Sequence, residues 1–244
     1  MQSLGKLVQR SAVARALFKP AVLSTQVRFN HSDPHEGCPN AWAYAVKARV
    51  QYPAPRFEGM SWNVDQFKKI SLDDYKGKYV VLFFYPLDFT FVCPTEIVEF
   101  NEKSDEFRKN GCELVACSID SHFTHQEFAN KPRDQGGLGG MKIPMLADLT
   151  KQIGKDYGCL TKDDAIHLRA TFIIDTKGVL RHSQFNDTPV GRNVDEVLRL
   201  VQAFQHNDKH GEVCPSKWKP GAHGMDADHK SSKTLKYWKQ EHTK

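Results

Sequence analysis

An apolar run followed by a cysteine at a helix start constrains this chain more than any other feature. Residues 79–85 read YVVLFFY, which is typical of a central strand covered on both faces. Cys93 then stands directly before Pro94, which fits the first turn of a helix because its missing N–H is not needed there. A thiol there meets unpaired backbone N–H groups and the positive end of the helix dipole, and both favour the thiolate. The sequence therefore predicts a reactive cysteine beside a buried strand.

The charge of the chain is concentrated at its N-terminus. Residues 1–32 carry five basic residues and no acidic one, which accounts for the whole net charge of +5, so the remainder is neutral. A neutral body lacks the basic footprint of a nucleic-acid binder. No apolar run approaches the roughly 20 residues that a membrane span needs. We therefore expect an ordinary globular protein with neither nucleic acid nor a membrane as its partner.

The N-terminal 32 residues have the composition of a targeting segment. They are basic, free of Asp and Glu, and dotted with apolar residues, as a mitochondrial transit peptide is. Arg10, Arg15 and Lys19 interrupt the continuous apolar core that a secretory signal requires. We expect cleavage near residues 28–32 and a location in the mitochondrial matrix. The alternative is a plain tail without a targeting role.

Strand and helix patterns alternate through the rest of the chain. Prolines break residues 33–56, and we expect an irregular linker there. We expect helices over 94–110, 124–130 (capped by Thr124 and Glu127), 150–157, 194–204 and 234–240, and further strands over 113–119, 170–175 and 179–185, the last two joined as a hairpin. This order predicts an α/β domain over 57–206 with a mixed central sheet covered by helices on both faces in a thioredoxin-like fold, followed by a C-terminal extension over 207–244.

The residues around Cys93 argue against a dithiol reductase, a third candidate function, because Glu96 stands where a C-x-x-C motif has its second cysteine. One thiolate alone can still attack a peroxide O–O bond and become a sulfenic acid. Several segments resemble those of the typical 2-Cys peroxiredoxins: PLDFTFVCPTE at 86–96, DSHFTH at 120–125, GGLG at 136–139, LRATFIID at 168–175, NDTPVGRNVDEVLRLVQAFQ at 186–205 and HGEVCPSKWKPG at 210–221. The likeness covers roughly residues 57–221 and continues weakly to the end.

The resemblance implies a thioredoxin-dependent peroxidase that reduces hydrogen peroxide and organic hydroperoxides without a cofactor or metal. Cys93 would be the peroxidatic cysteine. Cys214 would be the resolving cysteine of the neighbouring subunit, giving an intersubunit disulfide that thioredoxin reduces. The resemblance also implies a homodimer that assembles into a ring, such as a decamer or dodecamer, and sulfiredoxin as a further partner. A holdase chaperone or redox-relay role of the oligomer is the alternative function.

The resemblance also assigns the pocket around Cys93. Thr90 would hydrogen-bond the thiolate and the peroxide, while Pro86 would shield them from water. Arg169 would stabilise the thiolate and polarise the peroxide, and Glu96 and Arg192 would orient it. An arginine suits the task, since it keeps its charge and presents a planar fork to the charge that develops on the leaving oxygen.

Structural readings of these residues stand beside the functional ones. Cys93 as a small buried hydrophobe, Cys214 as a free surface thiol, and Arg169 and Arg192 as surface ion-pair partners are the alternatives. We expect three further cysteines to be packing residues: Cys112, Cys117 and Cys159. Cys38, in the linker, is instead a candidate for adventitious reactivity. His122 and His125 lack further ligands at metal spacing, so we expect solvated or capping histidines.

The C-terminal tail departs from the family pattern. In the family, GGLG and a C-terminal Tyr-Phe helix slow local unfolding at the active site, which leaves time for over-oxidation to the sulfinic acid. This chain has Tyr237-Trp238 in place of Tyr-Phe. Because Trp is larger, we expect the gate to persist with altered strength.

Overall fold

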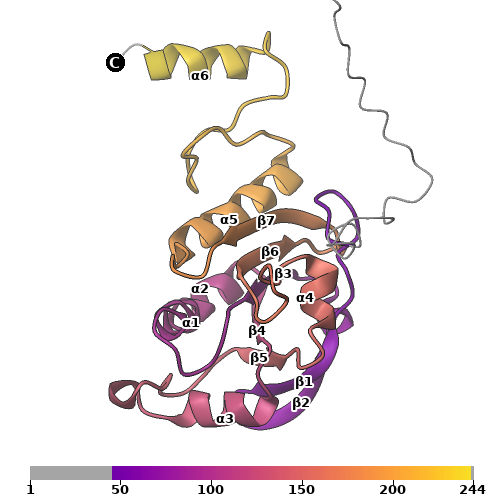
Figure 1. The fold of residues 1–244 in the computed structure, drawn as a ribbon. Coiled ribbons are helices and arrows are strands. Elements are labelled where there is room, and N and C mark those ends of the chain that lie inside the picture. Colours follow the sequence, from indigo (N-terminus) through magenta and orange to yellow (C-terminus); the bar gives the residue numbers. More distant parts are fainter. Residues whose placement is uncertain (1–45, 243–244) are drawn as a thin grey trace, which may run out of the picture.

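The computed structural model describes residues 46–242, which form a seven-stranded sheet with helices on both sides (Figure 1). The N-terminal segment predicted to be a transit peptide, residues 33–45 of the predicted linker, and Cys38 lie outside the described residues. In chain order the elements are β1 (Glu58–Asn63), β2 (Gln66–Ser71), η2 (Leu72–Tyr75), β3 (Tyr79–Phe84), α1 (Cys93–Glu102), α2 (Ser104–Lys109), β4 (Cys112–Ser118), α3 (His122–Asn130), η3 (Arg133–Gln135), β5 (Pro144–Ala147), α4 (Gln152–Tyr157), β6 (Arg169–Ile174), β7 (Leu180–Asn186), α5 (Val194–His210) and α6 (Ser232–His242).

The sheet runs in the order β2-β1-β5-β4-β3-β6-β7, with the apolar strand β3 near its middle. β3 pairs parallel with β4 and antiparallel with β6, so the sheet is mixed, as predicted. β6 and β7 form the predicted antiparallel hairpin. Gly178 sits in its turn with φ +79°, a left-handed conformation that a side chain would strain.

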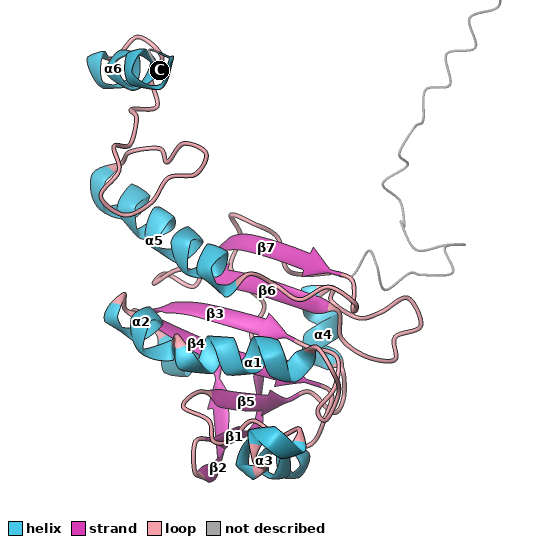
Figure 2. Ribbon diagram, turned by 90° about the vertical axis from the view of Figure 1, so that its left-hand side faces the viewer, coloured by secondary structure: helices cyan, strands magenta, loops and turns pink. Residues whose placement is uncertain are grey.

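Both faces of β3 are buried, and successive residues serve opposite layers. Val81 and Phe83 pack with α1 and α5, whereas Val80, Leu82 and Phe84 pack on the side of α4. Figure 2 shows α1 and α5 on one side of the sheet and α4 behind it. This two-sided burial explains why residues 80–84 carry no polar side chain, and it confirms the predicted layers.

The topology brings three chain segments to one edge of the sheet. The parallel strands β3 and β4 end there, and the antiparallel strand β6 begins there with Arg169. The loop after β3 leads to Cys93 at the start of α1. Residues that are far apart in sequence therefore converge at the carboxyl end of β3.

Several predicted elements differ from the observed ones. The single helix predicted from Pro94 to Gly111 is two helices, because α1 ends at Glu102 and α2 restarts at Ser104. The hairpin β1–β2 and the short strand β5 were not predicted. β2 has only Ile70 buried, and β5 has four residues, so neither presents a long apolar pattern.

Cap and boundary details also differ. The prediction that Thr124 caps the third helix is wrong: α3 begins at His122, and the Ser121 hydroxyl accepts the N–H of Thr124. α5 extends to His210, so the predicted domain boundary after residue 206 falls inside a helix. α6 lies beyond the far end of α5, away from the sheet, in both ribbon views (Figures 1 and 2). Among the described residues, no helix has the length and apolar character to cross a bilayer.

Candidate active site

Cys93 is the first residue of α1 and is almost completely buried, with 1% of its surface exposed. No side chain caps the helix there, although Glu96 adds an acidic residue to its first turn. The Arg169 guanidinium donates from Nη1 to the Cys93 sulfur at 3.4 Å. The thiol thus has a helix N-terminus on one side and a fixed positive charge on the other, which are the two features that stabilise a thiolate.

Glu96, Arg169 and Arg192 form one buried ionic cluster beside that sulfur. Glu96 accepts from Arg169 Nη1 at 2.7 Å through Oε2 and from Arg192 Nε at 2.8 Å through Oε1. The backbone N–H and Nη2 of Arg192 also bind Glu96, at 2.7 and 3.0 Å. Arg192 Nη1 donates to the carbonyls of Phe84 and Ala170, so strands β3 and β6 hold its guanidinium in place. The reading of these arginines as surface ion-pair partners is wrong, since each is at most 5% exposed.

The cluster stays charged, and its charges leave a positive excess at Cys93. Burial works to raise the pKa of Glu96, but hydrogen bonds and charge from Arg192, with the charge of Arg169, outweigh it and lower that pKa below 4.5. Burial opposes the charge on Arg169, yet its bonds to Cys93 and Glu96 raise its pKa. One carboxylate between two guanidinium groups has a net charge of +1, which a thiolate at Cys93 would neutralise.

The loop between β3 and α1 carries the other predicted residues. Pro86 is buried, whereas Phe91 is 92% exposed. The Thr90 hydroxyl donates to the carbonyl of Leu87 at 2.9 Å and not to Cys93, so in this conformation it can offer the sulfur or a peroxide only its lone pairs. Phe89 adopts a left-handed φ of +54°, which is uncommon for a residue with a side chain.

A buried polar network beneath this loop was missed at the sequence level. His125 is fully buried and binds Asp88, so the expectation that it is solvated or capping is wrong. The position of His125 in the helix could have predicted its burial. His125 lies four residues, or about one helical turn, after the Ser121 cap, and it shares the buried face of α3 with Phe128 and Ala129. A lone polar Asp88 after an apolar strand carried no comparable signal.

Cys214 occupies a different setting on the C-terminal extension. Its side chain is half-buried and its thiol donates to the carbonyl of Ala203 in α5 at 3.5 Å. It lines a cavity of about 410 Å³ together with Leu200 and Phe204. Burial raises the pKa of the Cys214 thiol, and the charge of Arg199 counteracts part of that rise.

The two predicted redox cysteines are apart in this chain. Both are free thiols, and Ala203 lies about 14 Å along α5 from the helix start near the active site. The prediction that the other cysteines are packing residues is confirmed for Cys112, Cys117 and Cys159, which are fully buried. Burial raises the pKa of each of these three thiols.

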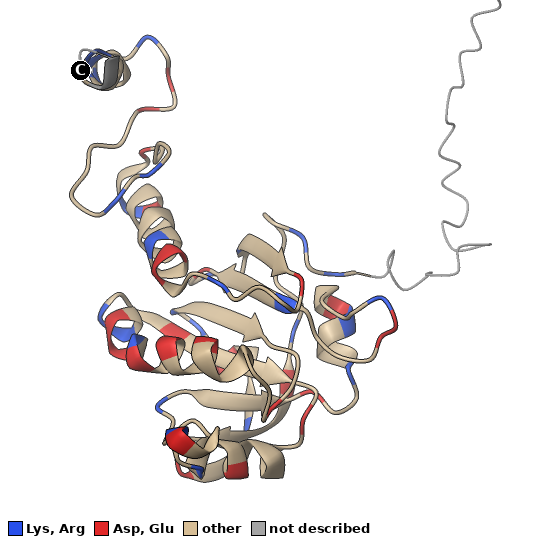
Figure 3. Ribbon diagram, turned by 60° about the vertical axis from the view of Figure 1, so that its left-hand side comes forward, with Lys and Arg blue, Asp and Glu red and all other residues tan. Residues whose placement is uncertain are grey.

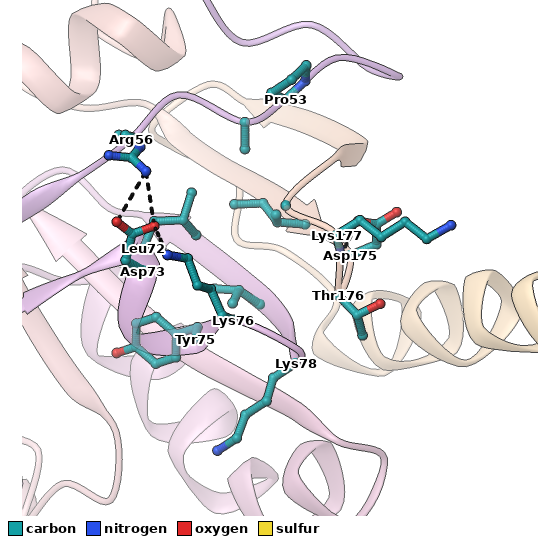
Figure 4. Close-up of a pocket in the computed structure, with 14 residues that line it drawn as sticks. Pro53, Arg56, Leu72, Asp73, Tyr75, Lys76, Lys78, Asp175, Thr176 and Lys177 are labelled. Atoms are coloured by element: carbon teal, nitrogen blue, oxygen red, sulfur yellow. Dashed lines mark hydrogen bonds and ion pairs between the residues drawn. The ribbon is translucent and has the colours of Figure 1, made fainter.

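A second hollow, of about 440 Å³, lies at the opposite end of β3 from Cys93. Figure 4 shows Arg56 and Lys76 turned to the same carboxylate, Asp73, while Lys78 and Lys177 extend away. Its cations therefore do not converge on one point. Within residues 46–242, no group of three or more His, Cys, Asp or Glu side chains is arranged to hold a metal. α1 carries acidic residues and no basic one, whereas α5 carries charges of both signs (Figure 3).

Comparisons with known proteins agree with this geometry. Residues 50–183 match the AhpC/TSA family, and residues 203–240 match the C-terminal domain of 1-Cys peroxiredoxin. "Peroxiredoxin-4" of Bos taurus is 59% identical over 182 residues, which is 75% of this chain and 66% of that protein. This chain thus matches just under two thirds of that relative.

Solved structures give the same picture. The reduced 2-Cys peroxiredoxin of Plasmodium vivax superimposes with a TM-score of 0.73 at 41% identity, covering 75% of this chain and 95% of that one. The mitochondrial 2-Cys peroxiredoxin of Plasmodium falciparum superimposes with a TM-score of 0.65 at 41% identity, covering 68% of this chain and 100% of that one.

Proposed function

The chain belongs to the AhpC/TSA family and is a peroxiredoxin, a thiol peroxidase, and on this premise we propose that Cys93 is the attacking cysteine. The Cys93 thiolate attacks one oxygen of the peroxide, so that a sulfur–oxygen bond forms as the O–O bond breaks. The sulfur is oxidised to a sulfenic acid, and the other oxygen takes up the proton that the Cys93 thiol lost on ionising, so that it leaves as water or an alcohol. The observation that carries this assignment is the buried Cys93 sulfur 3.4 Å from Arg169 at a helix start.

The neighbouring side chains supply charge and geometry for that step. Arg169 lies against the sulfur and can also bind the peroxide oxygen that becomes negative. Glu96 and Arg192 hold its guanidinium in place through the ion pairs of the cluster. Thr90 would accept a hydrogen bond from the peroxide O–H, because its own hydroxyl proton is donated to the carbonyl of Leu87. Pro86, buried at the end of β3, would exclude water from the reacting atoms.

The sulfenic acid is then resolved by Cys214 of the neighbouring subunit. The Cys214 sulfur attacks the Cys93 sulfur, water leaves, and an intersubunit disulfide forms, which thioredoxin reduces by thiol–disulfide exchange. One observation supports this role: Cys214 is half-buried, whereas the packing cysteines are fully buried. The extension that carries Cys214 matches the C-terminal domain of 1-Cys peroxiredoxin.

Peroxide consumption coupled to thioredoxin, thioredoxin reductase and NADPH tests both assignments. Cys93→Ser should abolish turnover, while Cys214→Ser should consume about one equivalent of peroxide and then stall. The buried Cys112→Ala is the control and should keep its turnover. Non-reducing electrophoresis should show a covalent dimer after peroxide that is absent in either serine variant. Normal turnover of Cys214→Ser with thioredoxin would contradict the resolving role.

Location, assembly and domain plan are further parts of the proposal. We propose that residues 1–32 direct the chain to the mitochondrial matrix, supported by their composition and by a structural neighbour described as mitochondrial. Mass spectrometry of the mature protein should find an N-terminus near residues 28–32, whereas an intact Met1 would contradict it. We expect a linker to residue 56, a catalytic domain over 57–206, and an extension from 207.

The assembly we propose is a ring of homodimers. Exposed aromatic side chains on the loop before α1 and on α3, Phe91 at 92% and Phe123 at 60%, support it as apolar groups that a second subunit would cover. Light scattering after size-exclusion chromatography should give the mass of a decamer or dodecamer, and a monomer or dimer would contradict the ring. We also expect sulfiredoxin and ATP to reduce the sulfinic acid form of Cys93. As an additional role of the oligomer, we expect a holdase activity that persists in Cys93→Ser.

A further inference from the structure

Asp88, His125 and Tyr85 form a buried network that the proposed chemistry does not use. The Tyr85 hydroxyl donates to Asp88 Oδ1 at 2.7 Å, and His125 Nδ1 lies 2.8 Å from Asp88 Oδ2. The side chains of Asp88 and His125 are 1% and 0% exposed. Burial raises the pKa of Asp88, and its bond to His125 opposes that rise. An unpaired polar group at this depth is costly, so each member depends on the others.

The network ties two elements together at the loop that leads to Cys93. Asp88 belongs to that loop, whereas His125 belongs to α3 and its Nε2 lies 3.3 Å from the carbonyl of Leu146 in β5. The backbone N–H of Asp88 donates to Asp120 Oδ2 at 2.9 Å, which holds the same residue from the end of β4. The loop is therefore anchored to the sheet five residues before the reactive sulfur.

A second contact between α3 and the loop involves Phe89, whose backbone conformation is strained. The ring of Phe89 packs against Phe128 of α3 at 4.8 Å between centroids, with Phe89 in its left-handed conformation. Such a conformation persists only when the surroundings impose it. Releasing Asp88 would allow Phe89 to relax, and the loop would carry Cys93 away from Arg169.

We propose that Asp88 and His125 are a positioning pair that holds Cys93 beside Arg169. The pair thereby sets the rate of Cys93 oxidation relative to the rate of disulfide formation. The pair favours attack on peroxide, which needs the buried sulfur against the guanidinium. It opposes disulfide formation, which needs the sulfenic sulfur to reach Cys214. This inference rests on the proposed function, because it concerns the rates of the same thiol.

Rapid-mixing kinetics of the full chain separate the two steps. Asp88→Asn or His125→Asn should lower the second-order rate of Cys93 oxidation by hydrogen peroxide between about tenfold and a hundredfold, since small misplacements cost that much. The same variants should form the intersubunit disulfide several-fold faster. They should also yield less sulfinic acid at high peroxide, because the second peroxide has less time to add its oxygen to the sulfenic acid.

A second buried pair offers a matched control. His167 Nε2 lies 3.1 Å from Asp148 Oδ2, and these side chains are also 0% and 1% exposed. Asp148 anchors the N-terminus of α4 through the N–H groups of Ile153 and Gly154, not the loop that carries Cys93. Asp148→Asn should therefore destabilise the protein similarly while leaving the ratio of the two rates unchanged.

The opposite movement of the two rates is the decisive result. Equal loss in both steps, or no change in their ratio, would overturn the positioning role while leaving Cys93 as the peroxidatic residue. Cys93→Ser with full turnover would overturn the proposed function itself. Tyr85→Phe, which removes one hydroxyl and keeps the ring, should shift the ratio in the same direction by less. It carries the test if the Asp88 or His125 variants fail to fold.

Discussion

The sites of the two proposed redox cysteines, Cys93 and Cys214, differ in how firmly the protein holds the sulfur atom. Cys93 is 1% exposed, starts a helix and touches the Arg169 guanidinium, which the Glu96 carboxylate and the carbonyl of Thr188 hold in place. Cys214 is half-buried on the extension, with one sulfur-to-carbonyl contact in its own α5. The Cys93 site is arranged in advance for attack on peroxide, and its loop must be released before the sulfenic sulfur can reach Cys214. The Cys214 site has fewer contacts to release, so we call the Cys93 site the rigid site and the Cys214 site the movable site.

The largest expected effect is on the rigid site. Glu96→Gln removes the carboxylate between two buried guanidinium groups, which should destabilise folding by about 3–5 kcal/mol because the positive charges lose their partner. Denaturant unfolding at pH 7 would measure the loss, and the rate of Cys93 oxidation should fall as well. Glu212→Gln is the control: its ion pairs with Lys233 and His206 are only partly buried and lie on the extension, so the main transition should move less than in Glu96→Gln. An equal loss of unfolding free energy in the two variants would contradict the difference proposed between the two sites.

The pH dependence of that effect sharpens the comparison. The pKa of Glu96 is lowered in the folded chain, so its contribution to stability is present above the unfolded value near 4.5 and is lost as pH falls through the lowered folded value. The stability difference between the native chain and Glu96→Gln should therefore be constant from pH 7 to about pH 5 and shrink below it. Unfolding curves measured across that range would test this, and a difference that grows in acid would contradict it.

The movable site should respond to alkaline pH. Burial raises the pKa of Cys214, so its thiolate fraction should grow about tenfold per pH unit until that pKa is passed. The rate of intersubunit disulfide formation should rise accordingly. Buried Trp218 lies four residues away and offers a fluorescence signal for stopped-flow measurement. A rate that is flat between pH 6 and 9 would show that loop movement, not thiolate formation, limits resolution.

The smallest expected effect comes from the tail. Because α6 lies away from the sheet in this chain, we expect a gate formed with residues 136–139 to use the tail of another subunit (Figure 1). Deleting residues 234–244 should raise the peroxide concentration that sulfinylates half of Cys93 by a few-fold, which mass spectrometry would measure. A truncated protein as sensitive as the intact one would refute the gate, whatever the effect of Trp238.

Sequence reasoning succeeded where local patterns decide the outcome. The apolar run of β3, the helix start at Cys93 and the β6–β7 hairpin depend on neighbouring residues, and all three were predicted. It failed where a residue's partner lies far along the chain. His125 is separated from Asp88 by 37 positions, and no periodicity in either segment indicates that they meet. The short strand β5 and the mostly exposed strand β2 were not predicted for a related reason: pairing with neighbouring strands stabilises them, and their own sequence pattern does not.

By itself, the sequence determined that a thiol begins a helix after a buried strand, because apolar periodicity and a proline act over a few residues. Only the tertiary structure decided which charges surround that thiol. Glu96 meets Arg169 and Arg192 across 73 and 96 positions, since the strand order brings the start of β6 and the segment before α5 to the end of β3. The energy of a buried charge depends on its neighbours in space, and the order of the strands selects those neighbours.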